Sequence, residues 1–201
     1  MKIILINSFD SIDSDSKYSI GDESISNEGL IKAREIGAEL KKKGLAKLFT
    51  SSFQSATETG LIIKKVVPLE LCSVSEFRAR NNFGVFLGWD KEEARKKFLS
   101  EVEDYESNKP YHQVSGSEDY FDFAKRITSS FNSIIKKEFE NKTPCIGFVL
   151  HSCGIEVIFR ELIGFEVNEI LEGALIEFDF DGEGFELLSS KGISGIESTS
   201  I

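Results

Sequence analysis

Short apolar runs alternate with amphipathic stretches along most of the chain. Residues 2–7 (KIILIN) and 143–150 (TPCIGFVL) are continuously apolar, which is typical of strands that are covered on both faces. A helix is expected over 26–43, with Ser26 as its N-cap and Gly44 as its stop. This alternation predicts a mainly parallel sheet with helices on both faces.

The same periodicities predict the remaining elements. Further strands are expected at 46–50 and 69–74, and further helices at 52–66, 91–106, 118–139 and from 152 to 164. An Asp-Gly turn separates 174–180 from 184–188 and predicts a hairpin. Residues 191–201 have no periodicity, so we expect one domain over 1–190 and a flexible C-terminal tail.

Charge and cysteine content narrow the function. The 201-residue chain has a net charge of −10, which argues against a nucleic-acid partner because phosphate backbones are bound by clustered Lys and Arg. It has no apolar run long enough for a membrane span and no signal peptide. Its three cysteines have no metal-site spacing, and we expect a reducing, cytoplasmic location.

An acidic stretch near the N-terminus raises the question of a metal site. Its side chains lack the spacing of a calcium loop, so we expect a solvated loop and neither a metal nor a cofactor. These residues are Asp10, Asp13, Asp15, Asp22 and Glu23.

The predicted sheet also indicates where a functional site would lie. In open α/β sheets the ligand binds outside the carboxyl ends of the strands. The residues that follow the two apolar strands are Asn7, Ser8 and Phe9 after the first, and His151 and Ser152 after the second. We expect these two groups to lie close together.

Several motifs in this order resemble the histidine phosphatase superfamily, also called the phosphoglycerate-mutase-like family. Residues 25–33 (ISNEGLIKA) resemble the family's L-T-x-x-G-x-x-Q-A, and 50–59 (TSSFQSATET) resemble T-S-x-L-x-R-A-x-Q-T. Glu118 followed by Arg126 is similar to the G-E-S…R helix opening, and His151 matches the second catalytic histidine. The resemblance implies a three-layer α/β/α sandwich with a mostly parallel central sheet.

The resemblance also exposes replacements at the reacting positions. Active members carry Arg-His-Gly after the first strand, and that histidine becomes phosphorylated; this chain has Asn7-Ser8-Phe9 there. The second pocket arginine of the family falls on Ser55 and the acid/base carboxylate on Arg80. The only other histidine is His112, so the nucleophile has no substitute in the first hundred residues. Phe9 replaces a glycine and is expected to close part of the site.

These observations leave three interpretations. The first is a catalytically impaired histidine-phosphatase-like protein that binds a small phosphorylated ligand or a protein partner. The second is a weak or atypical phosphomonoesterase or hydrolase that uses His151 with Ser8 or water. The third is a protein-interaction module that uses the outer face of the helices at 91–106 and 118–139. The sequence does not decide the oligomeric state.

Overall fold

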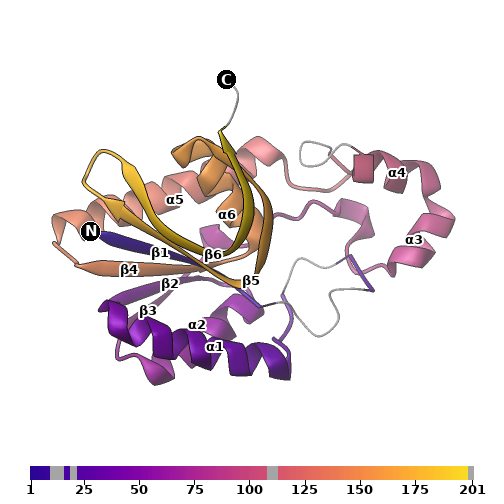
Figure 1. Cartoon of the computed structure of the whole chain (residues 1–201). Coiled ribbons are helices and arrows are strands. Elements are labelled where there is room, and N and C mark those ends of the chain that lie inside the picture. Colours follow the sequence, from indigo (N-terminus) through magenta and orange to yellow (C-terminus); the bar gives the residue numbers. More distant parts are fainter. Residues whose placement is uncertain (10–15, 19–21, 108–112, 199–201) are drawn as a thin grey trace.

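The computed structural model describes residues 1–9, 16–18, 22–107 and 113–198. Within these ranges six strands form one sheet in the order β3-β2-β4-β1-β5-β6 (Figure 1). The strands are β1 (Lys2–Asn7), β2 (Lys47–Ser51), β3 (Glu70–Val74), β4 (Cys145–Leu150), β5 (Phe165–Phe180) and β6 (Phe185–Ser198).

The first four strands are parallel, as the sequence predicts. β1 pairs in parallel with β4 from Lys2 with Cys145 to Asn7 with Leu150, and β2 pairs in parallel with β3 and β4. β5 and β6 extend the sheet as antiparallel strands. The carboxyl ends of β1 and β4 are therefore adjacent, which brings the two predicted groups of site residues together.

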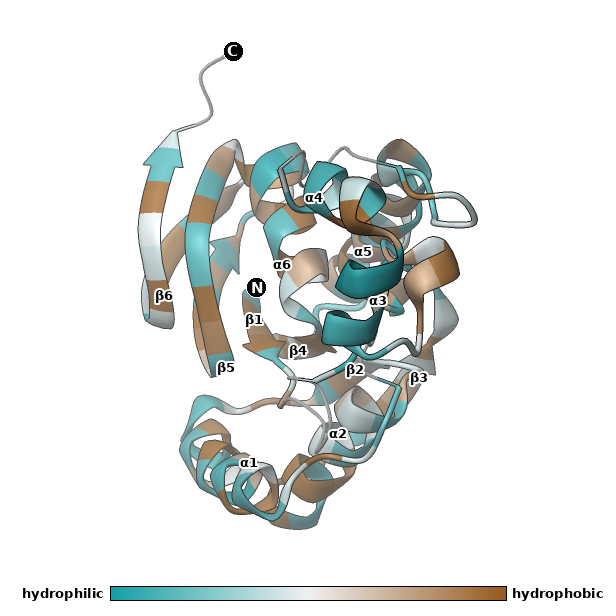
Figure 2. Ribbon diagram, turned by 90° about the vertical axis from the view of Figure 1, so that its right-hand side faces the viewer, coloured by the Kyte–Doolittle hydropathy of each residue, from teal (hydrophilic) through white to brown (hydrophobic). Residues whose placement is uncertain are grey.

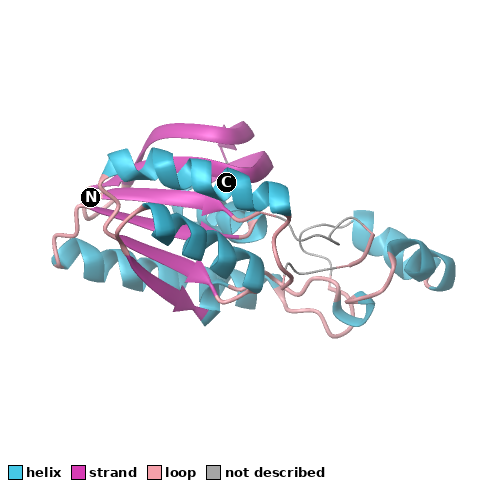
Figure 3. Ribbon diagram, turned by 90° about the horizontal axis from the view of Figure 1, so that it is seen from below, coloured by secondary structure: helices cyan, strands magenta, loops and turns pink. Residues whose placement is uncertain are grey.

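Helices cover both faces of the sheet. On one face lie α1 (Asn27–Leu40) and α2 (Gln54–Val66), and on the other lie α5 (Tyr120–Glu140) and α6 (Ser152–Ile158) (Figures 1 and 3). Their apolar sides face the sheet and their polar sides face outward (Figure 2). Each face has its own core, one centred on Phe148 and Phe131 and the other on Ile4 and Ile63. The expected three-layer α/β/α arrangement is confirmed.

The helix boundaries follow local signals in the sequence. The Ser26 hydroxyl accepts a hydrogen bond from the backbone N–H of Gly29 at 3.0 Å, which confirms the predicted N-cap of α1. After α1 the chain forms a 3₁₀ turn, Lys41–Lys43. This helical segment ends at Gly44, which has a φ of 72°. α6 continues as a π-helical turn, Phe159–Ile163, before Gly164.

The C-terminal hairpin is much longer than predicted. β5 starts at Phe165, nine residues before the predicted Ala174, and β6 runs to Ser198. Residues 191–198, predicted to be a flexible tail, are paired with β5. That prediction is wrong because glycines and register shifts interrupt the alternation that marks a strand. The last three residues of the predicted tail lie outside the described ranges.

A small helical cap projects from the carboxyl end of the sheet. It contains the 3₁₀ turn Gly84–Phe86 (η3), α3 (Lys91–Lys97) and α4 (Leu99–Ser107), and it stands apart from the layers (Figures 1 and 3). One helix was predicted over 91–106, but the chain breaks at Phe98, whose ring packs on Phe86 and Trp89. This aromatic packing gives the cap its own core.

Backbone contacts tie the cap to the rest of the chain. The N–H of Tyr18 donates to Trp89 O at 3.0 Å, and the N–H of Gly88 donates to Tyr18 O at 2.9 Å. Gly84 has a φ of +50°, and a Cβ at this position would lie 2.2 Å from the carbonyl oxygen of Ser115. Only glycine therefore allows the cap to cross the segment before α5 this closely.

Candidate functional site

The carboxyl end of β1 brings Ser8 against His151. The backbone N–H of Ser8 donates to Leu150 O at 2.8 Å, which continues the β1–β4 ladder past the end of both strands. The Ser8 hydroxyl, which is buried, lies 3.3 Å from Nδ1 of His151. The two residues predicted as the catalytic pair are therefore in hydrogen-bonding contact.

Asn7 turns away from this pair and toward β5. Its Nδ2 donates to Leu171 O at 3.0 Å and to Ile170 O at 3.5 Å. Both carbonyls lie beyond the last β1–β5 pair, Ile6 with Leu175. Asn7 thus links the end of β1 to β5 through its side chain.

Phe9 lies in the core between the sheet and α1. Its exposed fraction is 1%, and its ring occupies space left free by two glycines. A Cβ on Gly173 would lie 2.8 Å from the ring and one on Gly29 would lie 3.0 Å from the Phe9 Cβ. The expectation that Phe9 closes the site is not supported, because the ring packs under α1 with Ile36 instead.

His151 occupies the N-cap position of α6 but makes no cap hydrogen bond with its side chain. Burial lowers its pKa from 6.5 to about 4, and the carboxylate of Asp22 only partly opposes this effect. The imidazole is therefore neutral near pH 7 and offers one donor and one acceptor. Nε2 is buried and has no hydrogen-bond partner among the described residues.

Phe53 forms one wall of the site and was missed as a site residue. It directly precedes α2, and its ring meets the His151 ring edge-on at 5.7 Å. The sequence showed it only as the counterpart of a motif leucine. Its position could have indicated a site residue, because Phe53 is an aromatic residue that directly precedes a helix beginning beside the site.

The two serines predicted for the phosphate pocket lie in the first turns of the flanking helices. Ser55 is in α2 and is buried, and its carbonyl accepts from the Thr59 hydroxyl at 2.8 Å. Ser152 is the first residue of α6 and is half-buried. Both stand on elements that border the Ser8–His151 contact, α2 through the preceding Phe53 and α6 through its N-cap His151.

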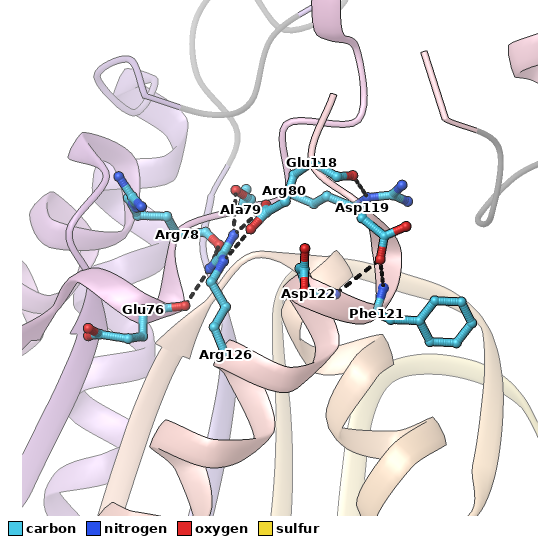
Figure 4. Close-up of polar contacts among 9 residues, drawn as sticks. All are labelled: Glu76, Arg78, Ala79, Arg80, Glu118, Asp119, Phe121, Asp122 and Arg126. Carbon is cyan, nitrogen blue, oxygen red and sulfur yellow. Dashed lines mark hydrogen bonds and ion pairs between the residues drawn. The ribbon is translucent and has the colours of Figure 1, made fainter. Parts of the chain in front are cut away.

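Arg80 binds the segment that leads into α5. Its Nε donates to Glu118 O at 2.9 Å (Figure 4). Its guanidinium lies 5.8 Å from the centre of the Tyr120 ring. Burial lowers its pKa, while the charges of Asp119 and Glu118 act in the opposite direction. Tyr105 in the cap and Cys153 in α6 also act on Arg80.

The motif pair Glu118 and Arg126 forms a dense polar cluster beside Arg80. Nε and Nη2 of Arg126 donate to the two carboxylate oxygens of Glu118 at 2.6 and 2.8 Å. Nη1 donates to the carbonyls of Arg78, at 2.7 Å, and of Glu76 (Figure 4). This fork fixes the loop between β3 and the cap.

A second cluster joins the loop before α1 to α2. The carboxylate of Glu58 accepts from Ser24, Gln54 and the N–H of Ile25 at 2.9 to 3.1 Å. Burial raises the pKa of Glu58, but these three donors outweigh burial and lower it. Asp22 accepts from the N–H of Gln54 at the start of α2. The sequence reasoning missed this cluster.

The acidic stretch near the N-terminus lies partly outside the described residues. The described residues contain no group of three or more His, Cys, Asp and Glu side chains that could hold a metal ion. Asp10, Asp13 and Asp15 lie outside the described ranges, as does His112.

Cys153 follows His151 closely, but burial raises its pKa to about 11, so its thiol stays protonated at neutral pH. Among the described residues, no helix is long and apolar enough to cross a membrane.

The arrangement around Ser8 suits hydrogen bonding better than charge neutralisation. It offers a hydroxyl, a neutral imidazole and an aromatic edge. Phosphoryl transfer needs positive charge placed on the transferred group. Of the Arg80 guanidinium, Nε donates to Glu118 O.

Solved structures share this fold at low sequence identity. The alpha-ribazole phosphatase from Shigella flexneri superposes with a TM-score of 0.80 at 15% identity, covering 98% of this chain and 100% of that chain. Bacillus stearothermophilus YhfR gives 0.81 at 15%, covering 96% and 98%. The phosphoglycerate mutase from Bacillus anthracis gives 0.76 at 19%, covering 96% and 92%.

The family assignment comes from the sequence itself. No curated protein sequence matches the chain. Residues 15–191, by contrast, match the family described as histidine phosphatase superfamily (branch 1). This match spans most of the chain and agrees with the shared fold. The chain therefore belongs to the histidine phosphatase superfamily.

Proposed function

We propose that this protein is a catalytically impaired member of its superfamily that acts by binding a ligand or a partner. One observation carries the proposal. The Ser8 hydroxyl stands 3.3 Å from His151, at the place where the family's motif has the histidine that is phosphorylated. A hydroxyl there cannot form a phosphohistidine, and the sequence has no histidine before His112.

The other replacements act in the same direction. Hydrogen bonds to charged groups contribute about 1.5–3 kcal/mol each. Replacing two arginines by Asn7 and Ser55 should therefore weaken phosphate binding by about 10²–10⁴-fold. Loss of a nucleophile that works within a catalytic unit costs on the order of 10⁶ in turnover. Arg80 does not supply the missing acid, because a guanidinium stays protonated at neutral pH.

Phosphatase assays test this proposal directly. Purified protein is incubated with p-nitrophenyl phosphate and with bisphosphoglycerate, beside a Ser8→Ala, His151→Ala double variant. We expect the same background rate from both proteins and no phosphohistidine by mass spectrometry. Turnover above the double variant, or a phosphorylated imidazole during turnover, would refute the proposal.

The contact between Ser8 and His151 favours a second candidate, a hydrolase with a serine nucleophile. The Ser8 proton would pass to Nδ1 of His151 as the hydroxyl attacks an ester. No described side chain orients the imidazole from Nε2, which distinguishes this pair from a complete triad. Under this candidate, either single variant abolishes p-nitrophenyl acetate hydrolysis; under the leading proposal neither changes it.

The cysteines support the expected cytoplasmic location. Cys72, Cys145 and Cys153 are all free thiols, and free buried cysteines persist best in a reducing compartment. The location remains part of the proposal.

A further inference from the structure

Neutral side chains occupy the positions next to the Ser8–His151 pair where the family's motifs place arginines. The family's two arginine positions hold Asn7, which donates to Leu171 O, and Ser55. The Arg80 guanidinium is engaged by Glu118 O and stacked over Tyr120. The charged group that acts on His151 is the carboxylate of Asp22. A phosphate dianion at this site would lose its hydration without gaining a compensating cation from Asn7, Ser55 or Asp22.

One atom of the site still requires a partner. Nε2 of His151 is buried and unpartnered among the described residues, and an unsatisfied buried polar atom costs about 1–3 kcal/mol. When Ser8 donates to Nδ1, Nε2 carries the hydrogen and can donate it. A ligand oxygen that accepts this bond would remove the penalty. A neutral imidazole donates to a hydroxyl or carbonyl oxygen without requiring a charge on the ligand.

The borders of the site add apolar surface. Phe53 presents its ring beside the imidazole. An aromatic surface next to a hydroxyl and an imidazole suits ligands with both C–H faces and O–H groups.

We propose that the site binds an uncharged, hydroxyl-bearing ligand of the sugar or polyol class in preference to a phosphate ester. The inference rests on the proposed function and changes the ligand class suggested by the sequence. The ligand hydroxyl oxygen accepts from Nε2 of His151, a second hydroxyl reaches Ser8, and its C–H face lies against Phe53.

Matched probes distinguish the two ligand classes. The imidazole nitrogens of His151 are followed by ¹⁵N NMR in the wild-type protein during titration with glucose, glycerol, their phosphate esters and inorganic phosphate. We expect the uncharged probes to shift the Nε2 resonance at millimolar concentrations. The phosphate esters should need at least about tenfold higher concentrations, because they bring an uncompensated charge.

A charge-restoring variant supplies the second measurement. Ser55→Arg returns a guanidinium to the motif position that carries arginine in active relatives, and Leu61→Arg adds the same charge at an exposed position of the same helix. We expect inorganic phosphate to bind at least about tenfold more tightly to Ser55→Arg than to wild type and Leu61→Arg. Thermal unfolding of each variant confirms that it is folded, and the wild-type titration stands without them.

The outcomes separate this inference from the proposed function. Tighter binding of phosphate than of the uncharged probes by wild type, without turnover, would overturn the ligand class and leave the binding role intact. The absence of any His151 shift with every uncharged probe would also overturn it. Turnover of the phosphate esters would overturn the proposed function itself.

Discussion

Two polar clusters at the same end of the sheet have opposite characters. Around Glu118 and Arg126, one guanidinium contacts a carboxylate and several loop carbonyls. Around Ser8 and His151, one contact of 3.3 Å joins two neutral groups. Both clusters derive from family motifs. The cluster that holds the loop and α5 together is charged, whereas the cluster around Ser8 and His151 is neutral, so the architecture does not depend on charge at the Ser8–His151 pair.

The largest effect is expected at the charged cluster. Arg126→Ala removes the fork that binds Glu118 and the carbonyls of Glu76 and Arg78, and it should lower the free energy of unfolding by about 3 kcal/mol. Arg126→Lys should recover only part, because an ammonium lacks the planar fork. Urea unfolding measures both, with the exposed Arg34→Ala as a control expected within about 0.5 kcal/mol of wild type. Equal losses at both arginines would contradict the role of the cluster.

A pH effect is expected at the neutral cluster. The pKa of His151 is about 4 in the folded protein and 6.5 without burial. Between these two pH values the unfolded chain therefore binds more protons than the folded protein. The contribution of His151 to the free energy of unfolding is fully present above pH 6.5 and is lost as the pH falls toward 4. The loss is at most about 3 kcal/mol. Denaturation midpoints between pH 4 and 8 in wild type and His151→Asn measure it, and identical slopes would show that His151 is not buried neutral.

A smaller effect is expected at Asn7. Asn7→Ala leaves the Leu171 carbonyl without its side-chain donor and should cost about 1.5 kcal/mol. Hydrogen exchange should increase locally in β5 near Leu171. If exchange rises instead around Ser8 and His151, Asn7 belongs to the site and not to the sheet.

The smallest effect is expected at Ser8. Ser8→Ala removes a single contact of 3.3 Å and should change the free energy of unfolding by about 0.5 kcal/mol. The same denaturation series measures it. A loss as large as that of Arg126→Ala would erase the difference between the two clusters.

The sequence predicted those parts of the fold whose signals are local. The apolar runs located β1 and β4, Ser26 marked the start of α1, and the Asp-Gly pair marked the β5–β6 turn. The full length of β5 and β6 was missed because glycine bulges and exposure of both faces remove the alternating pattern. The break at Phe98 was missed because it depends on aromatic packing within the cap and has no glycine or proline.

The sequence predicted where the site lies but not the directions in which all of its side chains point. Adjacent parallel strand ends brought Ser8 to His151, as the topology requires. The directions of Asn7 and Phe9 depend on distant partners, Leu171 in one case and Gly173 in the other. Each of these partners lies 164 residues further along the chain, so no local pattern encodes the contact.

The crossing at Gly84 has an evolutionary consequence. A methyl group there would meet a carbonyl oxygen at 2.2 Å, so selection on this position acts through shape and does not depend on what the protein binds. The Ser8 hydroxyl, by contrast, makes a single contact of 3.3 Å within the described ranges, with His151. As sequences close to this one diverge, position 84 should stay fixed while position 8 drifts whenever the ligand changes, and substitution rates at these two positions would record how often that happened.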